Sequence, residues 1–321
     1  MKYKKFGKTG MFVSELGLGT AQIGGPSIMR GKPRGAKPIT DEEAFKILAK
    51  AYDAGINFYD SSDMYGDGLA ETRLGKFFGN QPDVFIATKC GVNKDRNREF
   101  NKGYILKCLE GSLKRLKRER IDIFQLSKPT AKDLEKDAIY ETFDYLKTSG
   151  KIRYTGISVG TIEDGMLFAQ QQRVDSLQII YNLLTLEFSE NLIPTASRLG
   201  MGVIIRSPLS SGILTGCMNE NTKFPDYDDR KSFLHGELLR RRSWMVTQIK
   251  KKFNLTTNEE LIAFSLNYIM SNPNMPVPIP GSTSAAQLEQ NLRVLGMPRF
   301  TPGEWKEIHD FVVNLSLNTV D

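Results

Sequence analysis

Short apolar strands alternate with amphipathic helices along almost the whole of this chain, and this alternation constrains the fold more than any other feature. The predicted strands that precede helices begin near residues 15, 56, 84, 121, 154, 177, 203 and 277. Eight successive strand-then-helix units in 321 residues favour a closed (β/α)8 TIM barrel, an α/β fold whose chemistry lies at the carboxyl ends of the strands. We expect one barrel domain over residues 1–321, with extra helices near the carboxyl end.

The segments before the second strand carry clear local signals. Residues 4–6 and 11–13 flank a turn with two glycines and predict an N-terminal β-hairpin. The polar stretch 30–37, which contains Gly and Pro, predicts a loop. Thr40 and Glu43 have the spacing of a capping box, so a helix is expected to begin there.

A doubly wound sheet is the alternative fold. Gly17 and Gly19 make half of a dinucleotide-binding fingerprint, but Gln22 stands where the third glycine belongs. Gly24, Gly25 and Pro26 also oppose a helix at that point. The incomplete fingerprint counts against this fold.

The chain is basic, with a formal charge of +7 and a pI near 9.1, which suits an anionic ligand such as a phosphorylated cofactor, or nucleic acid. The densest basic run, residues 114–120, closes a predicted helix, where cations favour the negative end of the helix dipole. No aromatic residue interrupts the run. We therefore expect a solvated helix end and no nucleic-acid partner.

Cysteines and apolar runs indicate the compartment. No run of eighteen apolar residues exists, and the first five residues lack the apolar stretch of a signal peptide, so we expect a cytoplasmic protein without a membrane partner. Cys90, Cys108 and Cys217 show no CxxC spacing and suit packing in a reduced compartment, with Cys90 a candidate reactive thiol. Together with two distant histidines, they predict no metal site.

The candidate chemistry centres on residues 60–66. Asp60 ends a predicted strand, Tyr65 follows on the loop, and Lys89 ends the next strand. If the two strands are parallel neighbours, these side chains converge at one rim. There Lys89 would lower the pKa of Tyr65 from a free value of about 10, while Asp60 holds the ammonium in place. The predicted product is a general acid that works near neutral pH.

The sequence segments around these residues resemble those of the aldo-keto reductase superfamily. Matching segments continue in register over nearly the whole chain, at residues 55–60, 65–75, 87–89, 112–116, 121–126, 150–153, 156–158, 178–182, 207–216 and 279–291. The resemblance implies a barrel that binds NADP(H), or less favourably NAD(H), and transfers hydride between the cofactor and an aldehyde, ketone, keto-sugar or alcohol. It makes Tyr65 the proton donor, Lys89 its partner and Asp60 the residue that positions Lys89.

The same matching implies a set of cofactor-binding residues. Ser158 and Gln178 would hold the nicotinamide carboxamide, and Asp60 would touch the adjoining ribose. Ser207, Leu209 and Gly212 are expected along the pyrophosphate, and Gly281, Ser282, Thr283, Gln287 and Asn291 at the adenosine end. Gly19, Thr20, Arg206 and Gln290 complete the residues expected to bind the cofactor.

The sequence departs from the family pattern at three positions. Ser127 stands where the family usually has a histidine that polarises the substrate carbonyl, and loss of one such donor typically costs about 10²–10³ in rate. Thr283 replaces a frequent arginine that pairs with the 2′-phosphate, and Val159 replaces a frequent asparagine. Ser127 therefore marks a slow reductase or a site tuned for another carbonyl, for oxidation or for cofactor sensing.

Two other functions compete with a reductase. One is a cofactor-binding regulatory protein of the same fold, comparable to the potassium-channel β-subunits. The other is a barrel isomerase or aldolase with Lys89 as a Schiff base, which a protonated Lys89 disfavours. Substrate identity depends on variable loops near residues 24–37, 91–100, 128–133 and 217–235, and the sequence leaves the substrate and the oligomeric state open.

Overall fold

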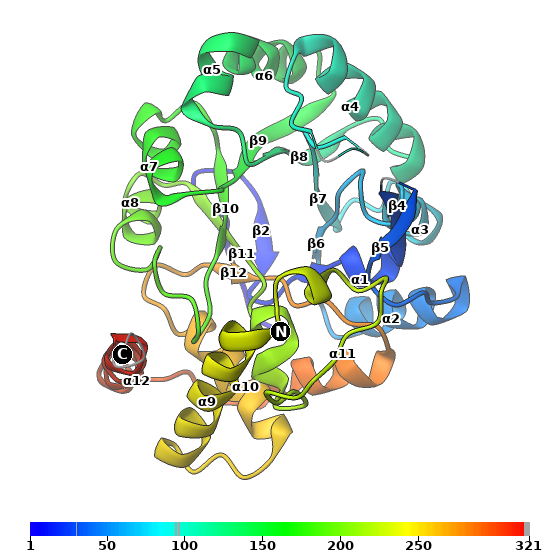
Figure 1. The fold of residues 1–321 in the computed structure, drawn as a ribbon. Helices are drawn as coiled ribbons and strands as arrows, with labels where there is room; N and C mark the ends of the chain where they lie inside the picture. The colour runs from blue at the N-terminus through cyan, green and yellow to red at the C-terminus, as the bar shows by residue number, and fades with distance from the viewer. Residues whose placement is uncertain (30, 94, 96, 318–321) are drawn as a thin grey trace.

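The computed structural model describes residues 1–29, 31–93, 95 and 97–317. Within them, eight parallel strands lie side by side in one sheet that curls into a nearly closed barrel (Figure 1). In sheet order the strands are β3 (Leu18–Gly19), β6 (Phe58–Asp60), β7 (Phe85–Cys90), β8 (Ile121–Ser127), β9 (Ile152–Ser158), β10 (Ser176–Ile180), β11 (Gly202–Arg206) and β12 (Val277–Pro278). Backbone hydrogen bonds also join the edge strands, from Gly17 N to Pro278 O at 2.9 Å and from Gly19 N to Pro280 O at 3.1 Å. The predicted barrel is confirmed.

One helix follows each barrel strand and packs outside the ring (Figure 1). In chain order these helices are α2 (Asp41–Asp53), α3 (Leu69–Phe77), α4 (Lys102–Leu116), α6 (Ile139–Thr148), α7 (Ile162–Gln171), α8 (Leu192–Arg198), α10 (Asn258–Met270) and α11 (Ala285–Leu292). α2 begins at the predicted capping box, in which Thr40 and Glu43 bond each other's backbone amides. Its buried face comprises Ala44, Ile47, Leu48 and Ala51, at helical spacing.

The N-terminal hairpin closes one end of the barrel. It consists of β1 (Tyr3–Lys5) and β2 (Phe12–Ser14), which pair antiparallel. Phe6, Met11 and Val13 are fully or almost fully buried and form a cluster with residues from the barrel strands, including Phe58 and Ile204. The hairpin therefore fills the amino-terminal end of the barrel and leaves the carboxyl-terminal rim for a site.

Several helices lie outside the strand-then-helix repeat. They are α1 (Ala21–Gly24), α5 (Ala131–Asp137), α9 (Gly236–Lys252), α12 (Pro302–Leu317) and the 3-10 helices η1 (Ser210–Thr215), η2 (Asp229–Ser232) and η3 (Arg293–Gly296). Sequence reasoning did not place a helix at 302–317, although Ile308, Val312 and Leu315 have helical spacing and are buried there. Among the helices the structure describes, none combines the length and apolarity needed to cross a membrane.

The loop prediction for residues 30–37 was wrong. β4 (Pro26–Met29) and β5 (Lys32–Gly35) form an antiparallel hairpin, and Arg30 lies outside the described residues. Strand pairing uses backbone groups, so polar residues form strands here without an apolar pattern. A distant segment supports β5, because Gly35 N donates to Tyr227 O at 2.9 Å. The short helix α1 also ends at Gly24, where the glycines had predicted none.

Candidate active site

Asp60 and Lys89 meet at the carboxyl-terminal rim, as expected for residues at the ends of neighbouring parallel strands. β6 and β7 pair directly, with Asp60 opposite Ala87. Lys89 Nζ lies 2.6 Å from Asp60 Oδ1 and also donates to Ser61 O at 2.8 Å. Asp60 is 1% exposed and Lys89 is 5% exposed. The two charges therefore form a buried, hydrogen-bonded ion pair.

Tyr65 lies beside this pair on the loop after β6. Lys89 Nζ is 4.7 Å from the centroid of the Tyr65 ring. Burial lowers the pKa of Lys89, but the charges of Asp60 and Tyr65 outweigh burial, so the pKa of Lys89 lies above its usual value. A lysine in this environment stays protonated, which argues against a Schiff-base nucleophile.

Two glutamine amides hold the second oxygen of Asp60. Gln178 Nε2 donates to Asp60 Oδ2 at 2.7 Å, and Gln125 Nε2 donates to the same atom at 2.8 Å. All three side chains are buried. Gln125 was not among the predicted site residues. The signal that could have found it is its place in β8, where a polar residue interrupts an apolar strand two positions before Ser127.

Ser127 ends β8, next to the end of β9. It pairs with Ser158 in the strand register, and Lys128 N donates to Ser158 O at 2.7 Å. Ser127 is half-buried and Ser158 is buried. The structure thus places both serines at the same rim as Asp60 and Lys89.

Arg206, at the end of β11, reaches across the sheet. It pairs with Ile180 in β10, and its Nη2 donates to Val159 O at 3.2 Å, just beyond the end of β9. Its Nε is buried and has no hydrogen-bond partner among the described residues. Burial lowers the pKa of Arg206, while Tyr65 and Asp60 oppose this effect. The guanidinium therefore belongs to the rim that carries Tyr65.

The loop that bears Tyr65 packs against α1 through glycine. A Cβ on Gly24 would lie 2.8 Å from the carbonyl carbon and oxygen of Tyr65, and a Cβ on Gly66 would lie 2.0 Å from Gly24 O. Gly66 has a φ of +61°, a left-handed conformation that glycine adopts without strain. In the sequence, Gly24 indicates only a residue that opposes a helix. Its contact shows that Gly24 positions the Tyr65 loop.

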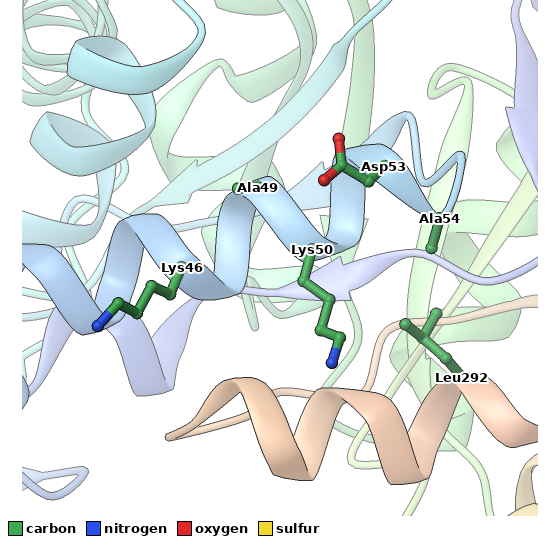
Figure 2. A pocket seen from close by; sticks show the side chains of 6 residues that line it. All are labelled: Lys46, Ala49, Lys50, Asp53, Ala54 and Leu292. Carbon is green, nitrogen blue, oxygen red and sulfur yellow. The ribbon is translucent and has the colours of Figure 1, made fainter.

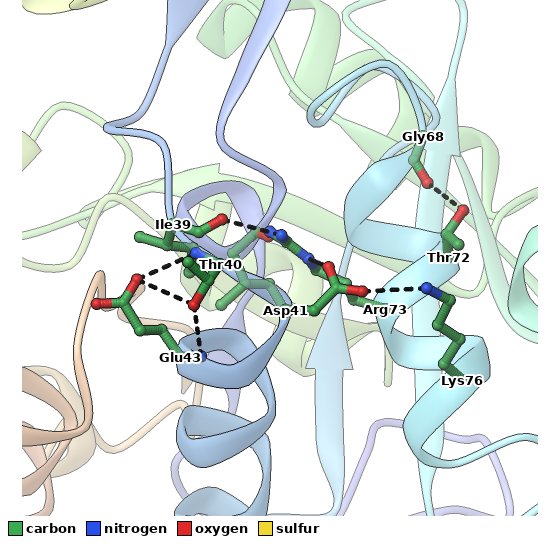
Figure 3. A network of polar contacts seen from close by, with 9 residues as sticks. Ile39, Thr40, Asp41, Glu43, Gly68, Thr72, Arg73 and Lys76 are labelled. Carbon is green, nitrogen blue, oxygen red and sulfur yellow. Dashed lines mark hydrogen bonds and ion pairs between the residues drawn. The ribbon is translucent and has the colours of Figure 1, made fainter.

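Arg73 anchors the same region from α3 (Figure 3). It is 4% exposed, and its Nε donates to Asp41 Oδ1 at 2.8 Å. Its Nη2 donates to Ile39 O at 2.9 Å, and its Nη1 donates to Ile23 O in α1. One buried guanidinium therefore joins α1, the start of α2 and α3, the elements around the Tyr65 loop.

Asp63 precedes Tyr65 on the same loop and contacts β7 at Lys89. Its backbone N donates to Lys89 O at 3.1 Å. Burial, with repulsion from Glu71, raises the pKa of Asp63 to about 6. Cys90, the neighbour of Lys89, is 1% exposed, and burial raises the pKa of its thiol well above the usual value. Cys90 is therefore a packing residue and a poor nucleophile.

The residues predicted for the cofactor follow the rim from β11 to α11. Asn182 Nδ2 donates a hydrogen bond to Ser207 O at 2.9 Å. Gly212 has a φ of +97° in the turn of η1. Ser207, Leu209 and Gly212 lie on this loop, directly after β11. They are therefore contiguous with Arg206 at the carboxyl ends of the strands.

The predicted adenosine-end residues and the other predicted cofactor residues, Gly19, Thr20 and Gln290, gather where the barrel closes. Gly19 bridges Gly281, and Thr20 Oγ1 donates to Asp60 O at 2.8 Å. Asn291 Nδ2 donates to Ser282 Oγ at 3.2 Å. Thr283 N donates to Gln287 Oε1 at 2.9 Å, and Gln290 Nε2 donates to Glu259 Oε1 at 3.3 Å. Of the variable loop at 91–100, residues 94 and 96 lie outside the described part of the chain.

A hollow lies between α2 and α11 on the outside of the barrel (Figure 2). Its lining residues come from α2 and its end, and from α11: Lys46, Ala49, Lys50, Asp53, Ala54 and Leu292. Its lysines are paired, Lys46 with Glu42 at 2.6 Å and Lys50 with Glu289 at 2.5 Å. It shares no residue with the rim, so it is a groove between two surface helices.

The fold and the site together define a class of protein. It is a (β/α)8 barrel with a rim tyrosine backed by a buried lysine–aspartate pair. The family model for the Aldo/keto reductase family matches residues 15–312, and the chain belongs to that family. Aldo-keto reductases are oxidoreductases that use nicotinamide cofactors and act on small carbonyl compounds.

Similar proteins span almost the whole chain. Aldo-keto reductase YhdN of Bacillus subtilis is 29% identical over 306 residues, covering 92% of this chain and 89% of that protein. Aldo-keto reductase yakc of Schizosaccharomyces pombe, whose name specifies NADP(+), is 28% identical over 290 residues. The match covers 85% of this chain and 83% of that protein.

Solved structures have the same fold. The holo form of aldo-keto reductase AKR11C1 from Bacillus halodurans superposes with a TM-score of 0.78 at 25% identity, covering 97% of this chain and 96% of that one. Glycerol dehydrogenase AKR11B4 from Gluconobacter oxydans gives a TM-score of 0.81 at 24% identity, covering 100% of this chain and 98% of that one. At this identity the likeness supports the fold alone.

Proposed function

We propose that this chain transfers hydride between NADP(H) and a carbonyl or alcohol substrate, with Tyr65 as the general acid and base. The substrate class comprises aldehydes, ketones and keto-sugars. The observation that carries the proposal is the position of Lys89 Nζ, 4.7 Å from the ring centroid of Tyr65 and 2.6 Å from Asp60 Oδ1. A cation fixed beside a phenol favours the phenolate and so assists proton transfer.

Each protein group has a distinct role in this proposal. The nicotinamide of the cofactor, when bound, supplies or accepts the hydride. Tyr65 Oη donates a proton to the carbonyl oxygen during reduction and accepts it during oxidation. Lys89 keeps its charge in both directions because its pKa is raised, and Asp60 holds the ammonium in place.

The residues at the rim fit a nicotinamide carboxamide. Gln178 Oε1 and Arg206 Nε are buried polar atoms without partners among the residues described, one an acceptor and the other a donor. A primary amide offers the complementary donor and acceptor. Gln178 and Ser158 would hold this group, with Ser207, Leu209 and Gly212 along the pyrophosphate. The adenosine end would lie at Gly281, Ser282, Thr283, Gln287 and Asn291.

NADP(H) is proposed over NAD(H) because the chain is basic, at +7, and because Thr283 offers a hydroxyl for the 2′-phosphate. The NADP(+) named for the relative yakc supports the same choice. Titration of the protein with NADPH and NADH tests it. Equal dissociation constants, or tighter binding of NADH, would contradict the preference.

The activity test is loss of absorbance at 340 nm when NADPH is mixed with a panel of aldehydes, ketones and keto-sugars. We expect turnover with at least one class, and Lys89→Met should abolish most of it. Wild-type protein that binds NADPH but turns over no panel member would favour a second function, a cofactor-binding regulatory protein. Ser127 favours that second function, because a short hydroxyl replaces the donor that usually polarises the carbonyl.

Ser127→His separates the two functions. If Ser127 is a weak donor in an enzyme, the histidine should raise turnover on the same panel, by roughly the 10²–10³ that one preorganised donor is worth. Unchanged turnover would show that the position does not contribute to the reaction.

A further inference from the structure

Arg206 carries a charge that the proposed mechanism does not use. Its Nη2 reaches Val159 O at 3.2 Å, but its Nε is buried without a partner in the described part of the chain. A buried guanidinium N–H is costly to leave unpaired, and arginine does not lose its proton in proteins. This side chain is therefore a fixed cation at the rim, and its buried Nε–H has no partner among the residues described.

The position of Arg206 is set by three adjacent strands. It ends β11, pairs with Ile180 of β10, and bonds the carbonyl of Val159, which follows β9. β9 and β10 also carry Ser158 and Gln178, the two residues proposed to hold the nicotinamide carboxamide. The guanidinium therefore lies beside the place where the nicotinamide ring would sit.

In the part of the chain that the structure describes, no carboxylate pairs with Arg206. Among the described residues, none forms a salt bridge with Arg206, and the acid that attracts it, Asp60, is already paired with Lys89 at 2.6 Å. The Asp60–Lys89 pair is neutral as a unit. Arg206 thus gives the nicotinamide end of the site a net positive charge.

We propose that Arg206 makes this site bind the reduced cofactor more tightly than the oxidised one. The nicotinamide ring is neutral in NADPH and positively charged in NADP⁺, so a fixed cation repels only the oxidised ring. The free Nε–H can also donate to the carboxamide oxygen, the contact that Val159 cannot make. The site would then take up NADPH and release NADP⁺, which favours reduction. The inference rests on the proposed function.

The test is the ratio of two dissociation constants, for NADP⁺ and for NADPH, measured by titration of the intact protein without substrate. Wild-type protein should bind NADPH about 10- to 100-fold more tightly, the range expected for two charges a few ångströms apart near a protein surface. Arg206→Met should lower the ratio of the NADP⁺ to the NADPH dissociation constant by about tenfold or more. Arg206→Lys keeps the positive charge and should retain most of the preference for NADPH. Arg173→Met removes an exposed arginine paired with Asp144 and should leave the ratio unchanged.

The outcomes separate the inference from the function on which it rests. Failure of wild-type protein to bind either nucleotide would overturn the proposed function and the inference with it. Binding of both forms with equal affinity would overturn the inference alone and needs no variant. A folded Arg206→Met protein that keeps the wild-type ratio would also overturn it.

Discussion

Gln125 Nε2 donates a hydrogen bond of 2.8 Å to Asp60 Oδ2, the carboxylate oxygen opposite the one that Lys89 contacts. Gln178 Nε2 donates to the same atom at 2.7 Å, so the carboxylate is held by two amides and one ammonium. A carboxylate held in this way cannot rotate, and the ammonium it binds keeps its place under Tyr65. Gln125 therefore acts on the site through Asp60.

Gln125→Leu should lower kcat by about 10- to 100-fold with little change in KM, because a small displacement of Lys89 misplaces the proton-transfer group. Steady-state kinetics on a substrate found in the carbonyl panel measure both constants. Gln171→Leu, on the exposed end of α7, is the control and should behave as wild type. Wild-type kcat in Gln125→Leu would show that Gln178 alone positions Asp60.

Tyr65→Phe should reduce turnover by roughly 10²–10⁴ while NADPH still binds, because the variant removes the proton donor and keeps the ring. The assay is NADPH consumption, with a separate titration for cofactor affinity. Tyr140→Phe removes a hydroxyl from α6, where it donates to Gln171 on the outside of the barrel, and should retain full activity. Retained turnover in Tyr65→Phe would assign the acid to another group.

Gly24→Ala should destabilise the fold by about 1–3 kcal/mol, typical of overpacking, because the new Cβ would lie 2.8 Å from the Tyr65 backbone. Displacement of that loop should also lower turnover. Chemical denaturation and the activity assay measure the two effects. Gly303→Ala, in α12, meets nothing within 4 Å and should be neutral or slightly stabilising. Equal stability of both variants would refute the role given to Gly24.

Stability should fall as pH rises from about 4 to about 6, through the titration of Asp63. The pKa of this carboxyl is raised from 3.8 in the unfolded chain to about 6 in the native state. Between these two pH values the native state binds a proton that the unfolded chain has lost, so the free energy of unfolding falls as pH rises. The contribution is on the order of 2–3 kcal/mol. Denaturation of wild type and Asp63→Asn at pH 4 and pH 7 measures it. The variant should lose this part of the pH dependence, and identical pH dependence in the two proteins would contradict the assignment.

Local patterns were sufficient to predict the barrel and the first members of the site. Strand and helix periods are properties of short segments, so the repeat of β6, α3, β7 and α4 follows from the order of apolar residues. Asp60 and Lys89 each end a strand, and parallel pairing brings strand ends together. The hairpin at β4 and β5 escaped prediction because its strands are held by backbone bonds and by a segment nearly two hundred residues away.

The sequence by itself was enough to predict the fold class and the meeting of Asp60, Tyr65 and Lys89 at one rim, because both depend on periodicity and on residues close to strand ends. Only the tertiary structure decided that Gln125 and Gln178 converge on one oxygen of Asp60, and that Arg206 crosses from β11 to Val159 with its Nε unpaired. The physical reason is that the strand register of the closed barrel brings together side chains from distant positions, such as Asp60 and Gln178, which lie 118 residues apart. Sequence spacing indicates that eight strands form a barrel, but it does not show which side chains on distant strands contact one another.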